Sequence, residues 1–234
     1  MNQDHRYIIA SGYYADEKKT SQLVNITKEQ FFPIWHANLM AHAQPVKTYV
    51  MNVSKRRAPG SYPGIDWIDI PHNLGHVNDF AAMNDFTTLS GWTMSALTGM
   101  MLAYSANADL IYVEQDALLF GDVVGQLYRE LNTKNKQMLF GNGHTEGFIE
   151  QSLFICRREF LLEFVQQYLG FNCGDWRIIP EHKWRTLMGR LPDKIGYYDF
   201  GYGRARPANF DDRIFFIQQP TDNEIEDLRK RNLL

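Results

Sequence analysis

Cysteine is scarce in this chain of 234 residues, which holds only Cys156 and Cys173. Neither belongs to a CxxC pair, so the sequence excludes a disulfide scaffold and a zinc site built on paired cysteines. Two reduced thiols fit a reducing compartment. The N-terminus, MNQDHRY, is polar and lacks the apolar segment of a secretory signal peptide. We therefore expect a cytoplasmic protein.

Long hydrophobic runs are also missing. The longest apolar-rich window, residues 92–108, is interrupted by threonine, serine, glycine and asparagine, which makes it too short and too polar to span a bilayer. Positive charge is not in excess either, because the formal net charge is −3. Proteins that bind nucleic acid through bulk charge are basic, so we expect no nucleic-acid partner. The lack of a long apolar run likewise leads us to expect no transmembrane segment.

What the chain does contain is a regular alternation of short apolar runs and amphipathic segments. Thr27 and Ser90 stand where helix N-caps are expected, and several apolar runs end at turn residues. This alternation predicts an α/β fold, a single domain over residues 1–234 with a mixed, mainly parallel sheet flanked by helices. The expected strands are 7–10, 46–53, 65–70, 110–113, 137–140 and 151–156, and the expected helices start after Thr27, Ser90 and Thr221 or cover 123–132, 158–169 and 181–188.

The stretch LIYVEQDALLFGD, residues 110–122, carries the most informative charges. Glu114 and Asp116 follow an apolar strand and, two residues apart, would share one face of it. Charged side chains are rarely buried unless they pair or bind a metal. In open α/β sheets, ligands bind beyond the carboxyl ends of the strands, which is where these two carboxylates would lie.

Spacing limits what the two carboxylates can do. Two residues of extended strand advance by about 6.6 Å, whereas oxygen ligands lie about 2.0–2.6 Å from Mg²⁺ or Ca²⁺. Glu114 and Asp116 can therefore reach one ion only if the backbone turns between them. Otherwise one binds directly and the other acts through water or a ligand hydroxyl. This layout suits a metal ion that bridges a diphosphate. The alternative is a strand end whose carboxylates are only solvated.

The run from Trp92 through a small-residue helix into ADLIYVEQDALLFGD resembles the centre of the GT-A glycosyltransferases, with Glu114 in place of the first Asp of their DxD motif. Further segments extend the resemblance over most of the chain: residues 8–14 are similar to the loop at which the nucleotide enters, 52–54 to the end of the second strand, 73–76 to an Asn/Gly loop, and 151–160 to the strand and helix on the acceptor side.

This resemblance implies a metal-dependent transferase that moves a sugar from a nucleoside-diphosphate sugar to a hydroxyl of a carbohydrate or glycan acceptor. Asp116 would bind Mn²⁺ or Mg²⁺ directly, since both suit carboxylate and phosphate oxygens, and Glu114 would contact the metal or the donor ribose. Residues 1–120 would form the donor half, and residues 121–234 the acceptor half and C-terminal tail. The implied donor contacts are Ser11, Gly12, Tyr13, Ser54, Asn73, Trp92, Glu114, Arg204 and Arg206.

An inverting transferase needs a carboxylate that takes the proton of the acceptor hydroxyl. The segment GDWRIIPEHKW, residues 174–184, offers Asp175 and Glu181. Pro180 suits the first turn of a helix, which places Glu181 at the positive end of the helix dipole. Because the family often has its base at such a helix start, Glu181 is the favoured candidate. A glutamate that only complements the dipole is the alternative.

Arg204 and Arg206 lie in a glycine-punctuated loop, and two arginines can clamp a diphosphate through bidentate contacts. They can equally pair with surface carboxylates. Two other functions also stay open. The glutamate at position 114 fits a glycosyltransferase-like domain that binds a nucleotide or sugar without turnover. A nucleotidyltransferase is less well supported, because SGYYADE, residues 11–17, is acidic and aromatic where such an enzyme has a glycine-rich, basic segment.

Overall fold

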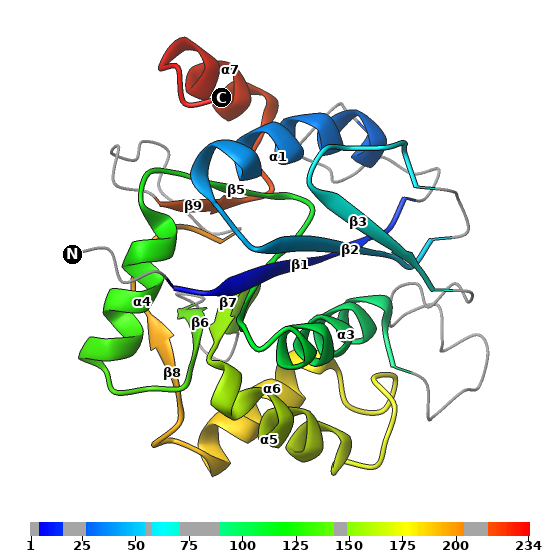
Figure 1. The fold of residues 1–234 in the computed structure, drawn as a ribbon, viewed down its shortest axis with the longest axis vertical. Coiled ribbons are helices and arrows are strands. Elements are labelled where there is room, and N and C mark those ends of the chain that lie inside the picture. Colours follow the sequence, from blue (N-terminus) through cyan, green and yellow to red (C-terminus); the bar gives the residue numbers. More distant parts are fainter. Residues whose placement is uncertain (1–4, 16–26, 55–57, 71–88, 143–148, 204–214) are drawn as a thin grey trace.

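A seven-stranded sheet runs through the middle of the molecule, with its strands in the order β3-β2-β1-β4-β7-β6-β8 (Figure 1). The structure is a computed structural model, and it describes residues 5–15, 27–54, 58–70, 89–142, 149–203 and 215–234. β7 pairs antiparallel with β4 and β6, and the other pairings in this sheet are parallel. The strands are β1 (Tyr7–Tyr13), β2 (Lys47–Asn52), β3 (Ile65–Asp69), β4 (Asp109–Val113), β6 (Met138–Asn142), β7 (Ile149–Cys156) and β8 (Ile195–Tyr198).

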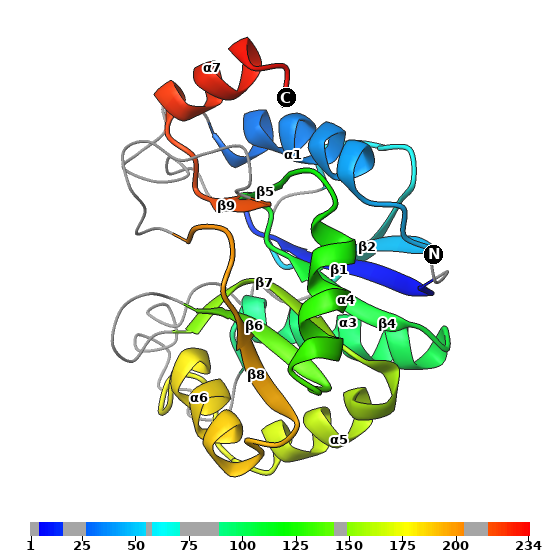
Figure 2. The same ribbon diagram turned by 90° about the vertical axis from the view of Figure 1, so that its left-hand side faces the viewer.

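Helices cover both faces of this sheet (Figures 1 and 2). Because side chains alternate along a strand, Ile9 and Ile111 belong to one buried core, and Ile8 and Leu110 to the other. The first core also holds buried residues of α1, α4 and α7, and the second those of α3, α5 and α6. The helices are α1 (Lys28–His42), α3 (Gly91–Ser105), α4 (Val123–Thr133), α5 (Arg158–Leu169), α6 (Pro180–Arg190) and α7 (Asp222–Lys230).

Local sequence explains where the two longest helices begin and how closely one of them packs. Thr27 caps α1 through a reciprocal capping box, and the Ser90 side chain accepts from a backbone amide in the first turn of α3. Gly99 of α3 faces β1, and a Cβ added there would lie 2.5 Å from the Cβ of Ala10. The absence of a side chain at Gly99 therefore lets α3 lie directly against β1.

A short antiparallel ribbon follows the carboxylate-bearing stretch. It consists of β5 (Ala117–Leu119) and β9 (Phe216–Gln218). Asn38 of α1, which is 4% exposed, donates to the carbonyl oxygen of Leu119 at 2.8 Å and accepts from its amide at 2.7 Å. One buried asparagine thus satisfies both backbone groups of Leu119 and fixes the ribbon against α1.

The expected α/β fold with a mixed, mainly parallel sheet and flanking helices is confirmed. Every strand and helix expected from the sequence is present, with bounds that differ by a few residues. β5, β8 and β9 were not expected. Within the described ranges, no helix has the length and apolar character that crossing a membrane requires. The division into donor and acceptor halves near residue 120 stays a prediction.

Candidate functional site

The carboxyl ends of β1 and β4 meet at one edge of the sheet, where the strand order changes direction. From β1 the sheet extends through β2 to β3 on one side, whereas the chain returns to β4 on the other side. A topological switch point therefore lies between β1 and β4, and ligands of open α/β sheets bind in such crevices. Because β7 is antiparallel to β4, its first residues lie at this same edge.

A turn directly after β4 carries the two predicted metal ligands. The amide of Ala117 donates to the carbonyl oxygen of Glu114 at 3.1 Å, so the backbone does turn between Glu114 and Asp116. Gln115, between them, is fixed by the end of β1: its Oε1 accepts from the amide of Tyr14 at 3.2 Å, and its Nε2 donates to the carbonyl oxygen of Tyr14 at 3.1 Å. The backbone turn that both carboxylates need in order to reach one ion is therefore present.

The two carboxylates have different surroundings. Oε2 of Glu114 accepts from the hydroxyl of Ser152 at 2.9 Å and from Nε2 of Gln218 at 2.8 Å. Oδ2 of Asp116 accepts from Nε2 of Gln219 at 3.1 Å. Oδ1 of Asp116, however, is buried and has no hydrogen-bond partner among the described residues. Burying such an oxygen without a partner is unfavourable, and a ligand bound to it would remove this penalty.

The negative charge of the turn also affects Tyr112, near the end of β4. Burial raises the pKa of the Tyr112 hydroxyl well above its ordinary value, and the charges of Glu114 and Asp116 raise it further. The hydroxyl therefore stays neutral and adds no charge of its own. The edge beside β4 is left with two carboxylates that a divalent cation would balance.

Glu181 lies in the first turn of α6, directly after Pro180. Its Oε1 accepts from Nε2 of Gln151 at 3.2 Å. Oε1 of Gln151 is itself buried, and within the described part of the chain it has no hydrogen-bond partner. The neighbouring residue, Ser152, is the one that donates to Glu114. Two consecutive residues at the start of β7 therefore contact Glu114 and Glu181, which the sequence assigned to one site.

β7 is irregular where it makes these contacts. Its register with β6 shifts between Phe140 and Gly141. A Cβ added at Gly141 would lie 2.8 Å from the Cβ of Glu150, so glycine permits the two backbones to approach here. Irregularities of this kind re-aim side chains and are common beside active sites.

Asp175 is placed very differently from Glu181. It is fully buried, and its Oδ1 lies 2.8 Å from Nζ of Lys183. It also accepts from the hydroxyl of Tyr168 at 3.0 Å and from the amide of Ser90 at 2.7 Å. A carboxylate enclosed in this way cannot receive a proton from an acceptor hydroxyl. The surroundings of Asp175 thus favour a structural role over the predicted role as a base.

The predicted donor contacts at the end of β1 are mostly core residues. Ser11 and Tyr13 are fully buried, and Tyr13 packs edge-on against Trp67 with 5.5 Å between ring centres. Their side chains therefore serve packing, and a role in donor binding is not supported for them. Gly12 is explained by its neighbour in α3, because a Cβ at Gly12 would lie 2.6 Å from Oγ of Ser95.

Ser54 and Trp92 make protein contacts of their own. The Ser54 hydroxyl donates to Oδ1 of Asn52 at 2.7 Å. Trp92, partly buried in the first turn of α3, packs edge-on against Tyr112 and Trp184, with ring centres 5.7 and 4.9 Å away. Donor contacts by Ser54 and Trp92 stay predictions. Three further predicted contacts lie outside the described residues: Asn73, Arg204 and Arg206.

Whether these side chains fit a metal depends on what else would bind it. The described residues contain no group of three or more His, Cys, Asp or Glu side chains that could hold an ion. Mg²⁺, however, is usually bound by one or two carboxylates together with substrate phosphates. Oδ1 of Asp116, unpartnered within the described ranges, fits a direct ligand. Glu114, which Ser152 and Gln218 already hold, fits a contact through water or a ligand hydroxyl.

Sequence reasoning missed the residues that hold the two carboxylates. Gln218 and Gln219 end the apolar run IFFIQQP, residues 214–220. This is the same pattern, an apolar strand ending in polar residues, that drew attention to Glu114. Ser152 gives no signal of its own, because its contact depends on the pairing of β4 with β7.

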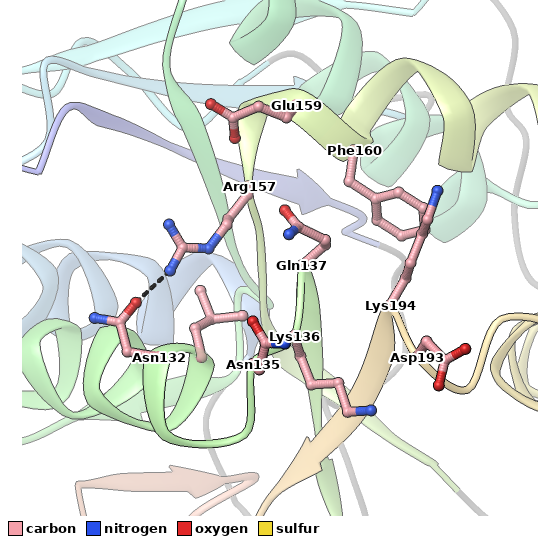
Figure 3. Close-up of a pocket in the computed structure, with 10 residues that line it drawn as sticks. Asn132, Asn135, Lys136, Gln137, Arg157, Glu159, Phe160, Asp193 and Lys194 are labelled. Atoms are coloured by element: carbon pink, nitrogen blue, oxygen red, sulfur yellow. Dashed lines mark hydrogen bonds between the residues drawn. The ribbon is translucent and has the colours of Figure 1, made fainter.

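A hollow of about 610 Å³ lies at the opposite edge of the sheet, where β6 and β8 begin and β7 ends. Figure 3 shows Lys136, Arg157 and Lys194 among the side chains around it, with Asp193 near Lys194. Lys194 is paired with Glu163 at 2.6 Å. No predicted site residue lines this hollow, so it is separate from the candidate site.

No protein-family model matches the sequence, and no curated protein matches it. Solved structures do match. The galactosyltransferase LgtC, in complex with donor and acceptor sugar analogs, is 10% identical and has a TM-score of 0.52. The match covers 97% of this chain and 94% of the LgtC chain. An active-site mutant of LgtC gives a TM-score of 0.51 at 11% identity, over 91% of this chain and 86% of its own. The glycosyltransferase GlyE of Streptococcus pneumoniae TIGR4 gives 0.50 at 10% identity, over 94% of this chain and 55% of its own. The chain has the fold of these glycosyltransferases, and the GT-A fold predicted from the sequence is confirmed.

Proposed function

We propose that this protein is a metal-dependent glycosyltransferase that moves a sugar from a nucleoside-diphosphate sugar to a hydroxyl of a carbohydrate or glycan acceptor. The fold supports this proposal, and the observation that carries it is the buried Oδ1 of Asp116, which has no hydrogen-bond partner among the residues that the structure describes. This oxygen belongs to a turn at the carboxyl end of β4, beside the topological switch point of the sheet. A divalent cation bound there with a diphosphate would give it the missing contact.

The carboxylates and their partners define how such a cation would be held. Asp116 would be the direct ligand of Mn²⁺ or Mg²⁺. Glu114 would contact the ion through water, or contact a hydroxyl of the donor. A bound cation supplies Lewis-acid chemistry, because it neutralises the charge that develops on the diphosphate as it leaves. Gln218 and Gln219 each donate to one of the two carboxylates. These contacts fix both side chains before a ligand arrives, which is what a preorganised site requires.

Glu181 is the residue that we assign as the base. Its carboxylate takes the proton of the acceptor hydroxyl while that oxygen bonds to the anomeric carbon of the sugar. The bond between this carbon and the diphosphate oxygen breaks, and the nucleoside diphosphate leaves with the electron pair. The positive end of α6 stabilises negative charge at Glu181, and Gln151 orients it. A single displacement of this kind inverts the anomeric configuration.

Thermal unfolding with Mn²⁺ and a panel of UDP, GDP, CDP and dTDP tests the proposal. We expect one nucleotide to stabilise the protein only when Mn²⁺ is present. A ligand at a hundred times its dissociation constant adds about 2.7 kcal/mol to the free energy of unfolding, which for a chain of this size is about 5–10 °C in Tm. Asp116→Asn should abolish the metal-dependent part of this shift.

The matched control is Asp227→Asn, the same chemical change on the exposed side of α7, where Asp227 pairs with Arg231. It should keep the full shift. The absence of a shift with every nucleotide, or a shift that persists in Asp116→Asn, contradicts the metal assignment. Metal-dependent binding without transfer of any sugar and without donor hydrolysis identifies a non-catalytic binding domain instead.

A further inference from the structure

Asp175 and Lys183 form an ion pair inside the protein. Their side chains are 0% and 1% exposed, and Nζ of Lys183 lies 2.8 Å from Oδ1 of Asp175. Nζ also donates to the carbonyl oxygen of Cys173 at 2.6 Å and lies 5.2 Å from the centre of the Tyr168 ring. A carboxylate, a carbonyl and an aromatic face thus surround the lysine.

Asp175 extends these contacts to two more helices. Its Oδ1 accepts from the hydroxyl of Tyr168, near the end of α5, at 3.0 Å. Its Oδ2 accepts from the amide of Ser90, the N-cap residue of α3, at 2.7 Å. α3, α5 and α6 lie side by side on one face of the sheet (Figures 1 and 2). One aspartate therefore joins the starts of α3 and α6 to the end of α5.

This network is connected to the candidate site through the first turn of α6. Lys183 and Glu181 belong to the same first turn of α6, and Glu181 is held on its other side by Gln151 of β7. Ser90 directly precedes the first turn of α3, which carries Trp92. Any shift of the α6 start relative to α3 would move Glu181 relative to β7.

Stability alone does not require a buried ion pair. Taking two charges out of water offsets much of their attraction, and well-packed apolar pairs of similar volume are often equally or more stable. An ion pair with additional hydrogen bonds is instead selective for geometry, because each donor must meet its acceptor within a narrow range of distance and angle. Apolar contacts between helices tolerate small shifts that these contacts do not.

We propose that Lys183 and Asp175 are positioning residues, which hold the first turn of α6 so that Glu181 meets the acceptor hydroxyl. Neither of the two touches the reacting atoms. This inference rests on the proposed function, and it deepens that function by giving the buried pair a role in the transfer step. It also explains why Asp175, the first carboxylate of the segment GDWRIIPEHKW, is enclosed rather than exposed.

The test is a double variant, Asp175→Asn with Lys183→Met. It removes both charges but keeps an amide that can bond to Ser90 and Tyr168, and a side chain of similar length. We expect this variant to fold, to keep the KM for the donor, and to lose about tenfold to a hundredfold in kcat, the scale expected for a misplacement of about 1 Å. A role in stability alone would leave kcat unchanged.

The matched control is Lys47→Met with Asp66→Asn, the same change in a pair whose side chains are 52% and 47% exposed. Its kcat should equal that of the wild type. An unchanged kcat in the folded double variant overturns the inference. If the double variant does not fold, Tyr168→Phe decides, because it removes one hydrogen bond to Asp175 and leaves the ion pair intact, although the same hydroxyl also contacts the Thr93 hydroxyl at 3.2 Å. A lowered kcat with unchanged KM supports positioning, and an unchanged kcat overturns it.

If the wild-type protein transfers no sugar, the proposed function is contradicted, but the role of the ion pair in holding α6 is not. Hydrogen exchange then separates the two. We expect the amides of residues 181–183 to exchange several-fold faster in the double variant than in the wild type and in the Lys47–Asp66 control, because the α6 start is released. Equal exchange in all three proteins shows that the pair does not hold this turn.

Discussion

Glu181 is the site residue whose chemistry can be removed with least disturbance to its neighbours. Glu181→Gln keeps the volume and an oxygen that can accept from Gln151, but the amide cannot take a proton. We expect kcat to fall by about 10²–10⁴-fold, the usual contribution of a general base. The Mn²⁺-dependent stabilisation by nucleotide should persist, because Asp116 is unchanged. Initial rates and Tm shifts on one preparation measure both.

The control for this variant is Glu226→Gln, on the exposed side of α7, which should have the kcat of the wild type. Two results would contradict the role of Glu181. One is a kcat that the substitution leaves unchanged. The other is a first product that retains the anomeric configuration of the donor, because a single displacement assisted by a carboxylate base cannot give it.

The contrast between Glu181 and Asp175 shows what a sequence reveals about single residues. Pro180 marks a helix start, and from it the position of Glu181 at the positive end of α6 could be predicted. The burial of Asp175 could not, because its partner Ser90 is 85 residues away along the chain. The Asp116 turn is an intermediate case. Its carboxylates were predictable from the end of a strand, whereas their contacts with Gln218 and Gln219, more than 100 residues away along the chain, were not.

Between elements, the packing of α3 on β1 gives a prediction about stability. Gly99→Ala would place a Cβ 2.5 Å from the Cβ of Ala10, so helix and strand must separate. We expect a loss of about 1–3 kcal/mol in the free energy of unfolding, as for other overpacked cores. Gly189→Ala is the matched control, since its Cβ meets nothing within 4 Å, and alanine is favoured over glycine in a helix by about 0.5–1 kcal/mol.

Urea unfolding of both variants measures the two effects. The expected result is a lower midpoint for Gly99→Ala and an equal or higher midpoint for Gly189→Ala. Midpoints that rise in both variants would show that helix propensity, rather than the approach of α3 to β1, decides the outcome.

The elements also differ in how visible they are in the sequence. Helices with a cap and a clear apolar pattern, such as α1 after Thr27, could be predicted because their signals are local. β5 and β9 have three residues each, and each is a strand only because it pairs with the other across a long separation, as in Ala117 with Gln218. No local pattern specifies such a pair. β9 matters for function all the same, because it delivers Gln218 to Glu114.

For the whole molecule, the stability should depend on pH through half-buried histidines. His42, in the last turn of α1, has its pKa lowered from its ordinary value of 6.5 by burial, although hydrogen bonds to the backbone of Gly121 and Leu233 oppose the shift. Burial also lowers the pKa of His5. The unfolded chain then binds more protons than the folded protein as the pH falls below about 6.5. By linkage, the free energy of unfolding decreases with falling pH through this window and levels off below the folded pKa values.

His42→Gln tests this expectation, because glutamine is polar but does not titrate. We expect the fall in Tm between about pH 7.5 and pH 5.5, where an ordinary histidine changes charge, to be smaller in the variant than in the wild type. His5 should preserve part of the dependence. His182→Gln, a change at an exposed position of α6, is the control and should keep the slope of the wild type. If Tm falls as steeply in His42→Gln as in the wild type, protonation of His42 does not destabilise the fold and the expectation is wrong.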